Sequence, residues 1–210
     1  MISIETTKQD FKDNYKLLIG AIVPRPIAVV STRNEDGSNN IAPFSFFNGV
    51  CSKPMIISFC PVLRTATGEK KDTLVNIERT KEFVVNFVTE STMEAINKTS
   101  TELPYGEDEF EYAGLTPMDS SIVGAKRLKE SPIHFECRLR DILQYGDGGP
   151  GTGFLVTGEV LMAHVEDKVY DRGRVLTDEF RPVGRGAGND WVLTKERAQL
   201  DRLMKAQIQK

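Results

Sequence analysis

The sequence predicts a mainly β protein in which a few helices are inserted between antiparallel strands that close into a barrel. Short apolar runs rich in β-branched residues recur at regular spacing, and turns containing glycine or proline separate them. No linker rich in proline, glycine or serine divides the 210 residues. With 40% hydrophobic residues the chain is long enough to bury one core, so we expect residues 1–210 to form a single domain.

The first predicted elements are a helix and a hairpin. Apolar side chains recur at helical spacing over residues 10–19, where an aspartate is the candidate N-cap and Gly20 ends the pattern. A β-branched run at 27–31, a turn at 35–38 and an extended stretch at 40–44 then predict two paired strands. The hairpin is therefore expected to begin the sheet.

The chain departs from the strand pattern at Pro43, which has no N–H to donate to a ladder. Phe44, Phe46 and Phe47 surround Ser45 immediately after it. One interpretation is a barrel rim that holds a planar ring. The other is that the three phenylalanines fill a core beneath an ordinary turn, and this stretch alone favours the core.

Four further segments are predicted as strands, and one glycine-rich run as a turn. The continuous apolar run at 82–88 indicates a central strand buried on both faces, whereas alternation at 133–140 indicates a half-exposed strand. The run at 146–153 lacks the Lys-Ser/Thr of a P-loop and precedes a long strand at 154–165, so we expect a hairpin turn. In the strand at 55–60, one face is expected to be core and the other to meet a polar ligand.

A helix is expected to begin at Asp72 or Thr73, either of which can cap it. Arg64, Lys70 and Lys71 precede that start. Cations beside the N–H groups and positive dipole end of a helix form a plausible phosphate seat. A solvated loop with a routine cap is the alternative, and the local chemistry alone favours that alternative.

The remaining segments carry loops and two more helices. Residues 91–99 are expected to be helical, and the five carboxylates of residues 102–111 indicate solvated surface rather than acid/base machinery. A glycine-rich turn at 181–191 contains two arginines and the only tryptophan. A charged amphipathic helix is expected from Lys195 to the C-terminus.

Composition excludes several classes of function. A formal net charge of −3 with scattered Lys and Arg gives no basic stripe, so nucleic acid is not expected as a partner. The N-terminal segment has no hydrophobic secretory signal and no run of about 18 apolar residues occurs, so we expect no membrane span and a cytoplasmic protein.

The residues that most often carry metal or acid/base chemistry are sparse. Cys51, Cys60 and Cys137 lack paired spacing and are interpreted as small buried hydrophobes. His134 and His164 lie thirty residues apart on predicted strands and are interpreted as structural. No metal site and no catalytic residue is therefore predicted, which disfavours a hydrolase.

Five ordered motifs between Arg25 and Trp191 resemble one known family. They are Arg25-Pro26-Ile27 to Thr32, Asn40-Ile41-Ala42-Pro43-Phe44-Ser45-Phe46-Phe47, Lys71-Asp72-Thr73 with Asn76, Gly158-Glu159-Val160, and Pro182-Val183-Gly184-Arg185 to Trp191. The chain resembles the flavin reductase-like proteins, whose FMN-binding split β-barrel is a Greek-key barrel. It is most similar to the branch that contains the reductase component of nitrilotriacetate monooxygenase and to flavoredoxin-like proteins.

The resemblance implies which residues bind FMN. It places the ring on the loop Ala42, Pro43, Phe44, Ser45 and Phe46, the ribityl chain along Ser58 and Cys60, and the phosphate at Lys71, Asp72 and Thr73, with Arg64 a further candidate. It also implies a homodimer with flavin at the interface, which Arg185 and Asn189 approach from either chain.

Three functional hypotheses remain. The first is a flavin reductase that transfers hydride from NADH or NADPH to flavin and supplies reduced flavin to a partner monooxygenase. The second is a flavoredoxin-like FMN electron carrier without its own nicotinamide site, because many reductases of the family have a histidine in the hairpin where this chain has Gly146–Thr152. The third is a barrel that binds no flavin.

Overall fold

The computed structural model describes residues 1–104 and 106–201. The helices are η1 (Thr6–Lys8), α1 (Phe11–Ala21), α2 (Asp72–Thr80), α3 (Met93–Lys98), α4 (Glu109–Ala113), η2 (Asp167–Val169) and α5 (Thr177–Phe180). The strands are β1 (Ala28–Arg33), β2 (Asn39–Phe44), β3 (Phe47–Ser52), β4 (Met55–Phe59), β5 (Glu82–Phe87), β6 (Pro117–Met118), β7 (Arg127–Leu128), β8 (Ile133–Tyr145), β9 (Gly153–Val165), β10 (Tyr170–Asp171), β11 (Arg174–Val175), β12 (Val183–Arg185) and β13 (Trp191–Leu193). The prediction of a mainly β chain with inserted helices is confirmed.

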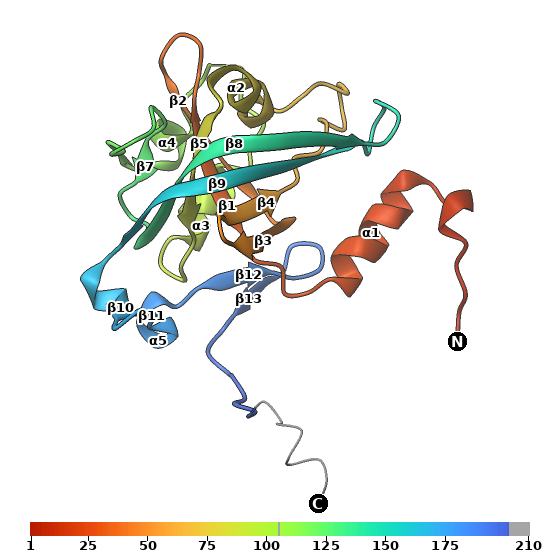
Figure 1. Cartoon of the computed structure of the whole chain (residues 1–210). Helices are drawn as coiled ribbons and strands as arrows, with labels where there is room; N and C mark the ends of the chain where they lie inside the picture. The colour runs from red at the N-terminus through yellow and green to blue at the C-terminus, as the bar shows by residue number, and fades with distance from the viewer. Residues whose placement is uncertain (105, 202–210) are drawn as a thin grey trace, which may run out of the picture.

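One antiparallel sheet of seven strands forms the body of the molecule, in the order β2-β1-β5-β8-β9-β4-β3. The long β8–β9 hairpin crosses it, and α2 lies above the β1–β2 end (Figure 1). Strand β5 lies between β1 and β8, and Phe83, Val84 and Val85 are completely buried. The apolar run at 82–88 therefore correctly predicted a central strand buried on both faces.

The barrel is split rather than closed. Strands β2 and β3 are the two edges of the sheet although only Ser45 and Phe46 separate them, and within the described ranges no ladder joins them. Pro43 has no N–H, so β2 lacks one donor for a ladder. After β2 ends, the carbonyl of Phe46 accepts from the N–H of Cys60 at 2.9 Å. The expectation of full closure is thus corrected, and the split barrel implied by the family resemblance is confirmed.

Two apolar cores lie on opposite faces of the β1–β2 hairpin. The inner core fills the barrel and includes Phe44, Phe59 and Phe83, with Phe47 packed at its margin. The outer core lies between the other face and helices α3 and α4. The core interpretation of the phenylalanine cluster is therefore confirmed for Phe44 and Phe47, whereas Phe46 lies only half-buried beside α1.

Helix α1 extends away from the barrel, and none of its residues is buried (Figure 1). Asp10 caps it as predicted, by accepting from the N–H of Lys12 at 2.8 Å. The expected C-terminal helix is wrong for residues 195–201, which are not helical, and the rest of that expectation lies outside the described residues. No helix in the described ranges has the length and hydrophobicity to span a membrane.

The cysteines and histidines occupy contrasting environments. Cys137 is a buried hydrophobe as predicted and Cys60 is half-buried, but Cys51 is exposed on edge strand β3, so the prediction is wrong for it. His134 is buried and its Nδ1 lies 2.9 Å from Oδ1 of Asn86. Burial lowers the pKa of His134 to about 4, which keeps it neutral and supports the structural interpretation.

Candidate functional site

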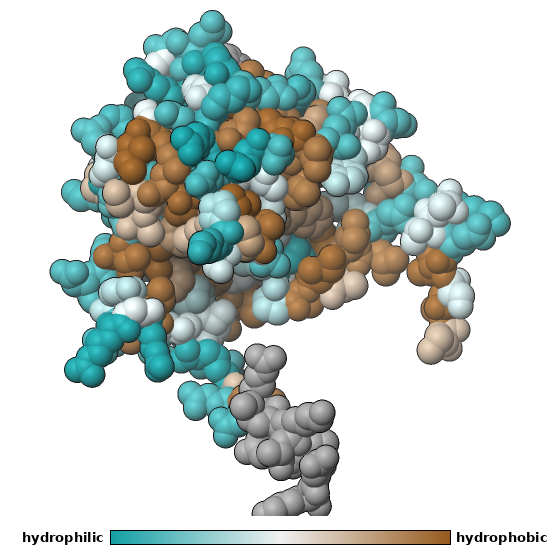
Figure 2. Space-filling model, viewed as in Figure 1, coloured by the Kyte–Doolittle hydropathy of each residue, from teal (hydrophilic) through white to brown (hydrophobic). Residues whose placement is uncertain are grey.

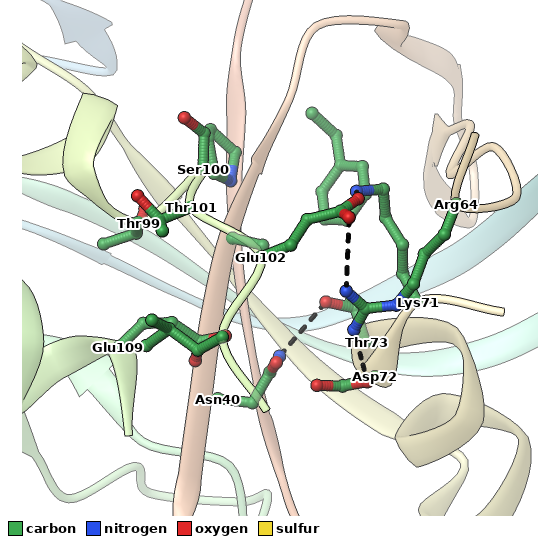
Figure 3. A pocket seen from close by; sticks show the side chains of 14 residues that line it. Asn40, Arg64, Lys71, Asp72, Thr73, Thr99, Ser100, Thr101, Glu102 and Glu109 are labelled. Atoms are coloured by element: carbon green, nitrogen blue, oxygen red, sulfur yellow. Dashed lines mark hydrogen bonds and ion pairs between the residues drawn. The ribbon is translucent and has the colours of Figure 1, made fainter. Parts of the chain in front are cut away.

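A cleft lies where β2 ends, beside the start of α2 and the segment that leads into α4 (Figure 3). Its cavity volume is about 70 Å³. Its lining residues are Asn40, Ala42, Pro43, Phe44, Arg64, Lys71, Asp72, Thr73, Thr99, Ser100, Thr101, Glu102, Leu103 and Glu109. Apolar groups from β2 thus face charged and hydroxyl groups across one concave surface.

The first turn of α2 opens into this cleft without a side-chain cap. Lys71 is the N-cap residue in extended conformation, so the expectation that Asp72 or Thr73 caps the helix is wrong. Both of those side chains have other partners: Asp72 accepts from Arg64, and Thr73 from Asn40. In the part of the chain that the structure describes, the backbone N–H groups of Asp72 and Thr73 have no acceptor. Two donors at a positive dipole end therefore remain for a ligand.

A buried polar network holds the start of α2 in this position. The Asn40 amide donates to Thr32 at 2.9 Å and to Thr73 at 3.1 Å. The Asn76 amide donates to the same Thr32 at 3.0 Å and to Asn34 at 2.6 Å. All five side chains are buried, so misplacing the helix would leave several polar groups unsatisfied. The N–H groups are thereby preorganised before any ligand arrives.

Two of the three predicted cations reach the cleft. The Nη2 of Arg64 lies 2.8 Å from Oδ1 of Asp72, and the Nζ of Lys71 lies 3.5 Å from Oε1 of Glu102. Lys70 instead pairs with Glu78 at 2.7 Å and does not line this cleft. We call Arg64, Lys71 and the N–H groups of Asp72 and Thr73 the anion seat.

Glu109 gives the cleft a charge that depends on pH. Its side chain is buried, and its Oε2 accepts from the N–H of Ile41 at 3.0 Å. Burial raises the pKa of Glu109 to about 7, and the nearby charges of Asp72 and Asp108 act in the same direction. The carboxyl therefore titrates near neutrality. The expectation that residues 102–111 are only solvated surface is wrong here.

The loop after β2 carries the last two residues of the predicted ring platform, Ser45 and Phe46, away from the cleft. Ser45 does not line it, and its Oγ accepts from Nε of Arg25 at 3.3 Å. Phe46 faces Tyr15 of α1, with ring centroids 6.4 Å apart. Cys60 joins this loop through its backbone bond to Phe46, whereas Ser58 lies on β4 opposite Asn48 of β3.

Arg25 joins the loop to two other segments and was not predicted as a site residue. Its guanidinium donates to the carbonyls of Ile19, Ile22 and Gly186 at 2.7–2.9 Å, and the residue is 4% exposed. One buried cation thus fixes the end of α1 and the β12–β13 hairpin beside Ser45. The only earlier signal for it was its place at the start of the first motif.

Arg185 and Asn189 lie on that hairpin, outside the cleft. The guanidinium of Arg185 donates to the carbonyls of Gly188 and Asn189 and lies 5.3 Å from the ring centroid of Trp191. Its charge therefore braces the glycine-rich turn within one chain.

Comparison with known proteins agrees with this architecture. The profile of the flavin reductase-like domain matches residues 20–182. The chain belongs to the flavin reductase-like family. An uncharacterized protein of Halalkalibacterium halodurans is 42% identical over 193 residues, which cover 91% of each chain. A second uncharacterized protein, from Bacillus subtilis, is 42% identical over 194 residues, covering 91% of this chain and 94% of the relative.

Solved structures resemble this flavin reductase-like chain over nearly its whole length. Nitrilotriacetate monooxygenase component B from Bacillus cereus superposes with a TM-score of 0.90 and 38% identity, covering 95% of this chain and 98% of the other. The 2-nitrobenzoate 2-nitroreductase of Pseudomonas fluorescens superposes with a TM-score of 0.86 and 28% identity, covering 97% of this chain and 98% of the other. The flavoredoxin of Desulfovibrio vulgaris shares the fold at 22% identity, with a TM-score of 0.71 and coverage of 88% and 93%.

Within this flavin reductase-like fold, the structure gathers seven of the thirteen predicted site residues into one cleft. These are Ala42, Pro43, Phe44, Arg64, Lys71, Asp72 and Thr73. Ser45, Phe46, Ser58, Cys60, Arg185 and Asn189 lie elsewhere. The lining residues that the sequence did not predict are Asn40, Thr99, Ser100, Thr101, Glu102, Leu103 and Glu109. Asn40 begins the second family motif, and the polar run Thr99–Thr101 lies between two short helices.

Proposed function

We propose that this chain is an FMN-binding oxidoreductase that transfers hydride from NADH or NADPH to flavin and supplies reduced flavin to a partner monooxygenase. The observation that carries the proposal is the anion seat beside the apolar end of β2. Membership of the flavin reductase-like family supports the chemistry. The likeness to a nitrilotriacetate monooxygenase component B supports the partner. A cytoplasmic location belongs to the proposal because the supply of reduced nicotinamide lies there.

The donor set of the cleft fits a phosphate monoester. Two cations and two free backbone N–H groups match the anionic oxygens of such a group, and charge-assisted hydrogen bonds are the strong ones. Ala42, Pro43 and Phe44 provide an apolar wall next to those donors. We assign Arg64, Lys71, Asp72 and Thr73 to the phosphate and this wall to the part of FMN that adjoins it.

We assign the ring end to the loop and its neighbours. Ser45 and Phe46 follow the apolar wall directly, and Cys60 is bonded to Phe46. Arg25 brings the hairpin of Arg185 and Asn189 to the same loop, and Ser58 lies on the adjoining strand. When bound, the flavin would supply the hydride-accepting chemistry. The task of this chain is to orient the ring and exclude water, so it needs no acid/base pair.

A second copy of the chain is the proposed cover for the ring end. Helix α1 buries none of its residues and leaves Tyr15, Leu17 and Leu18 about half exposed. Figure 2 shows hydrophobic surface along this helix. So much unpaired apolar surface beside Phe46 is unusual for a lone domain and suits a two-fold interface. We propose a homodimer in which Arg185 and Asn189 lie close to the flavin.

A flavoredoxin-like electron carrier is the second candidate, and the β8–β9 turn favours it. Residues Gly146–Thr152 contain no histidine, so this turn offers no imidazole to a nicotinamide ring. Such a carrier would bind FMN in the same cleft but receive electrons from another protein. The third hypothesis, a barrel without flavin, predicts no affinity for FMN at all.

An anaerobic absorbance spectrum with FMN, recorded before and after NADH or NADPH is added, separates these candidates. Rapid bleaching of the flavin band, faster than with free FMN, is expected for a reductase. Bound flavin that neither nicotinamide reduces would identify the carrier, and the absence of any bound flavin would contradict both.

The phosphate assignment has its own test in Lys71→Ala combined with Thr73→Ala. Removing these groups should weaken FMN binding at least tenfold, because hydrogen bonds to charged groups contribute about 1.5–3 kcal/mol each. Lys70→Ala is the matched control, since its ammonium pairs with Glu78 outside the cleft and should leave the affinity unchanged. Equal affinities in both variants, with the fold intact, would show that the phosphate binds elsewhere.

A further inference from the structure

Glu102 places a carboxylate of the chain itself at the anion seat. Its Oε1 lies 3.5 Å from Nζ of Lys71, and its Oε2 lies 3.9 Å from Nη1 of Arg64 (Figure 3). These are the two cations assigned above to the phosphate of the ligand. A carboxylate and a phosphate cannot both neutralise them without bringing like charges together.

The formal charges that line the cleft show why the ligand and Glu102 must compete. Arg64 and Lys71 face the carboxylates of Asp72, Glu102 and Glu109. Asp72 is fixed by its 2.8 Å contact with Arg64, and Glu109 by the N–H of Ile41. A phosphate carries about −1.5 to −2 charges at pH 7, so the seat becomes strongly negative unless one carboxylate leaves.

Glu102 is the carboxylate that is free to leave. Its side chain is 46% exposed, and both of its ion pairs are longer than 3.4 Å. In the part of the chain that the structure describes, these two ion pairs are the contacts that hold its carboxylate. A second hollow on the other side of the Arg64–Glu102 pair, lined in part by Thr67, Val75 and Pro104, offers room for the displaced side chain.

We propose that Glu102 is a built-in competitor for the anion seat: its carboxylate occupies the seat in the free chain and is displaced by a ligand that bears a phosphate monoester. The inference rests on the proposed function in taking FMN as that ligand. The consequence is specific to the phosphate. Glu102 weakens the binding of FMN but not of riboflavin, and so favours a flavin that exchanges over one that is permanently held.

The test compares Glu102→Gln with the wild type by titration with FMN and with riboflavin, following flavin fluorescence. Loss of the competing charge should tighten FMN binding roughly tenfold, the effect of about one pKa unit of charge interaction, and leave riboflavin unchanged. The difference in FMN affinity between Glu102→Gln and the wild type should shrink at high salt. Glu107→Gln, an exposed carboxylate in the same segment that does not line the cleft, is the matched control and should behave as the wild type.

Equal or weaker FMN binding by Glu102→Gln would overturn the proposal, as would an equal gain for riboflavin. If neither flavin binds the wild type, the proposed function fails but the competitor remains testable with inorganic phosphate. Phosphate should then raise the unfolding temperature of Glu102→Gln more than that of the wild type. An equal rise in both proteins would overturn the proposal independently of flavin.

Discussion

Glu109→Gln is expected to remove a pH dependence of stability that the buried carboxyl creates. Burial raises the pKa of Glu109 from 4.5 to about 7 in the folded chain. Because the folded state prefers the neutral acid, the stability is fully present below about pH 4.5 and is lost as the pH rises to about 7. A shift of about 2.5 pKa units corresponds to roughly 3 kcal/mol. Glutamine keeps an acceptor for the N–H of Ile41 and cannot ionise.

Urea unfolding at pH 5 and pH 8 measures this difference. Between these values the wild type should lose roughly 2.5 kcal/mol more unfolding free energy than Glu109→Gln, because part of the effect is already lost at pH 5. Glu111→Gln, an exposed neighbour on α4, is the control and should follow the wild type. A Glu109→Gln protein whose pH dependence equals that of the wild type would refute the argument that burial governs this carboxyl. FMN affinity should follow the same pattern, since an ionised Glu109 adds negative charge to the cleft.

Three further perturbations test the fold and the ring end. Gly158→Ala should cost roughly 1–3 kcal/mol in urea unfolding, because its Cβ would lie 2.3 Å from Cζ of Phe83 in a close-packed core; an unchanged midpoint would show that the ring moves aside freely. Arg25→Ala should leave three backbone carbonyls without their donor and so increase hydrogen exchange in α1. Unchanged protection of α1 from exchange would mean that another contact anchors the helix. The dimer predicts that Leu18→Glu lowers the mass measured by light scattering towards 23.5 kDa and weakens FMN binding; wild-type flavin travelling with a 23.5 kDa species would rule out a dimer-dependent site.

Strands could be predicted from the sequence because their signal is local. The uninterrupted apolar run at 82–88 and the alternation at 133–140 each report burial directly, and both appear in the sheet as β5 and β8. The helix cap failed for a physical reason, since Asp72 and Thr73 bind Arg64 and Asn40 instead. Asn40 is 33 residues from Thr73, and the bond from Arg64 depends on how the loop before α2 folds, so a capping pattern cannot anticipate either partner.

The same distinction between local and long-range signals applies to the candidate site. Arg64, Lys71 and the start of α2 were predicted together because they are close in the sequence. Glu102 and Glu109 were not, because their roles depend on how the segment between α3 and α4 folds over β2. The bond from Ile41 to Glu109, 68 residues apart, shows that an acidic stretch typical of solvated surface lies against the cleft.

The two ends of the proposed flavin site differ in what holds them in place. At the anion seat, buried amides and hydroxyls join α2 to the β1–β2 hairpin, so one chain completes this end before a ligand binds. At the ring end, a few hydrogen bonds of Arg25 connect Ser45 and the β12–β13 hairpin to the end of α1, a helix that buries none of its residues. Affinity for the phosphate should therefore survive in a monomer, whereas orientation of the ring should require the partner. We therefore expect a monomeric variant to keep its affinity for inorganic phosphate. The same variant should bind FMN no more tightly than a simple phosphate monoester.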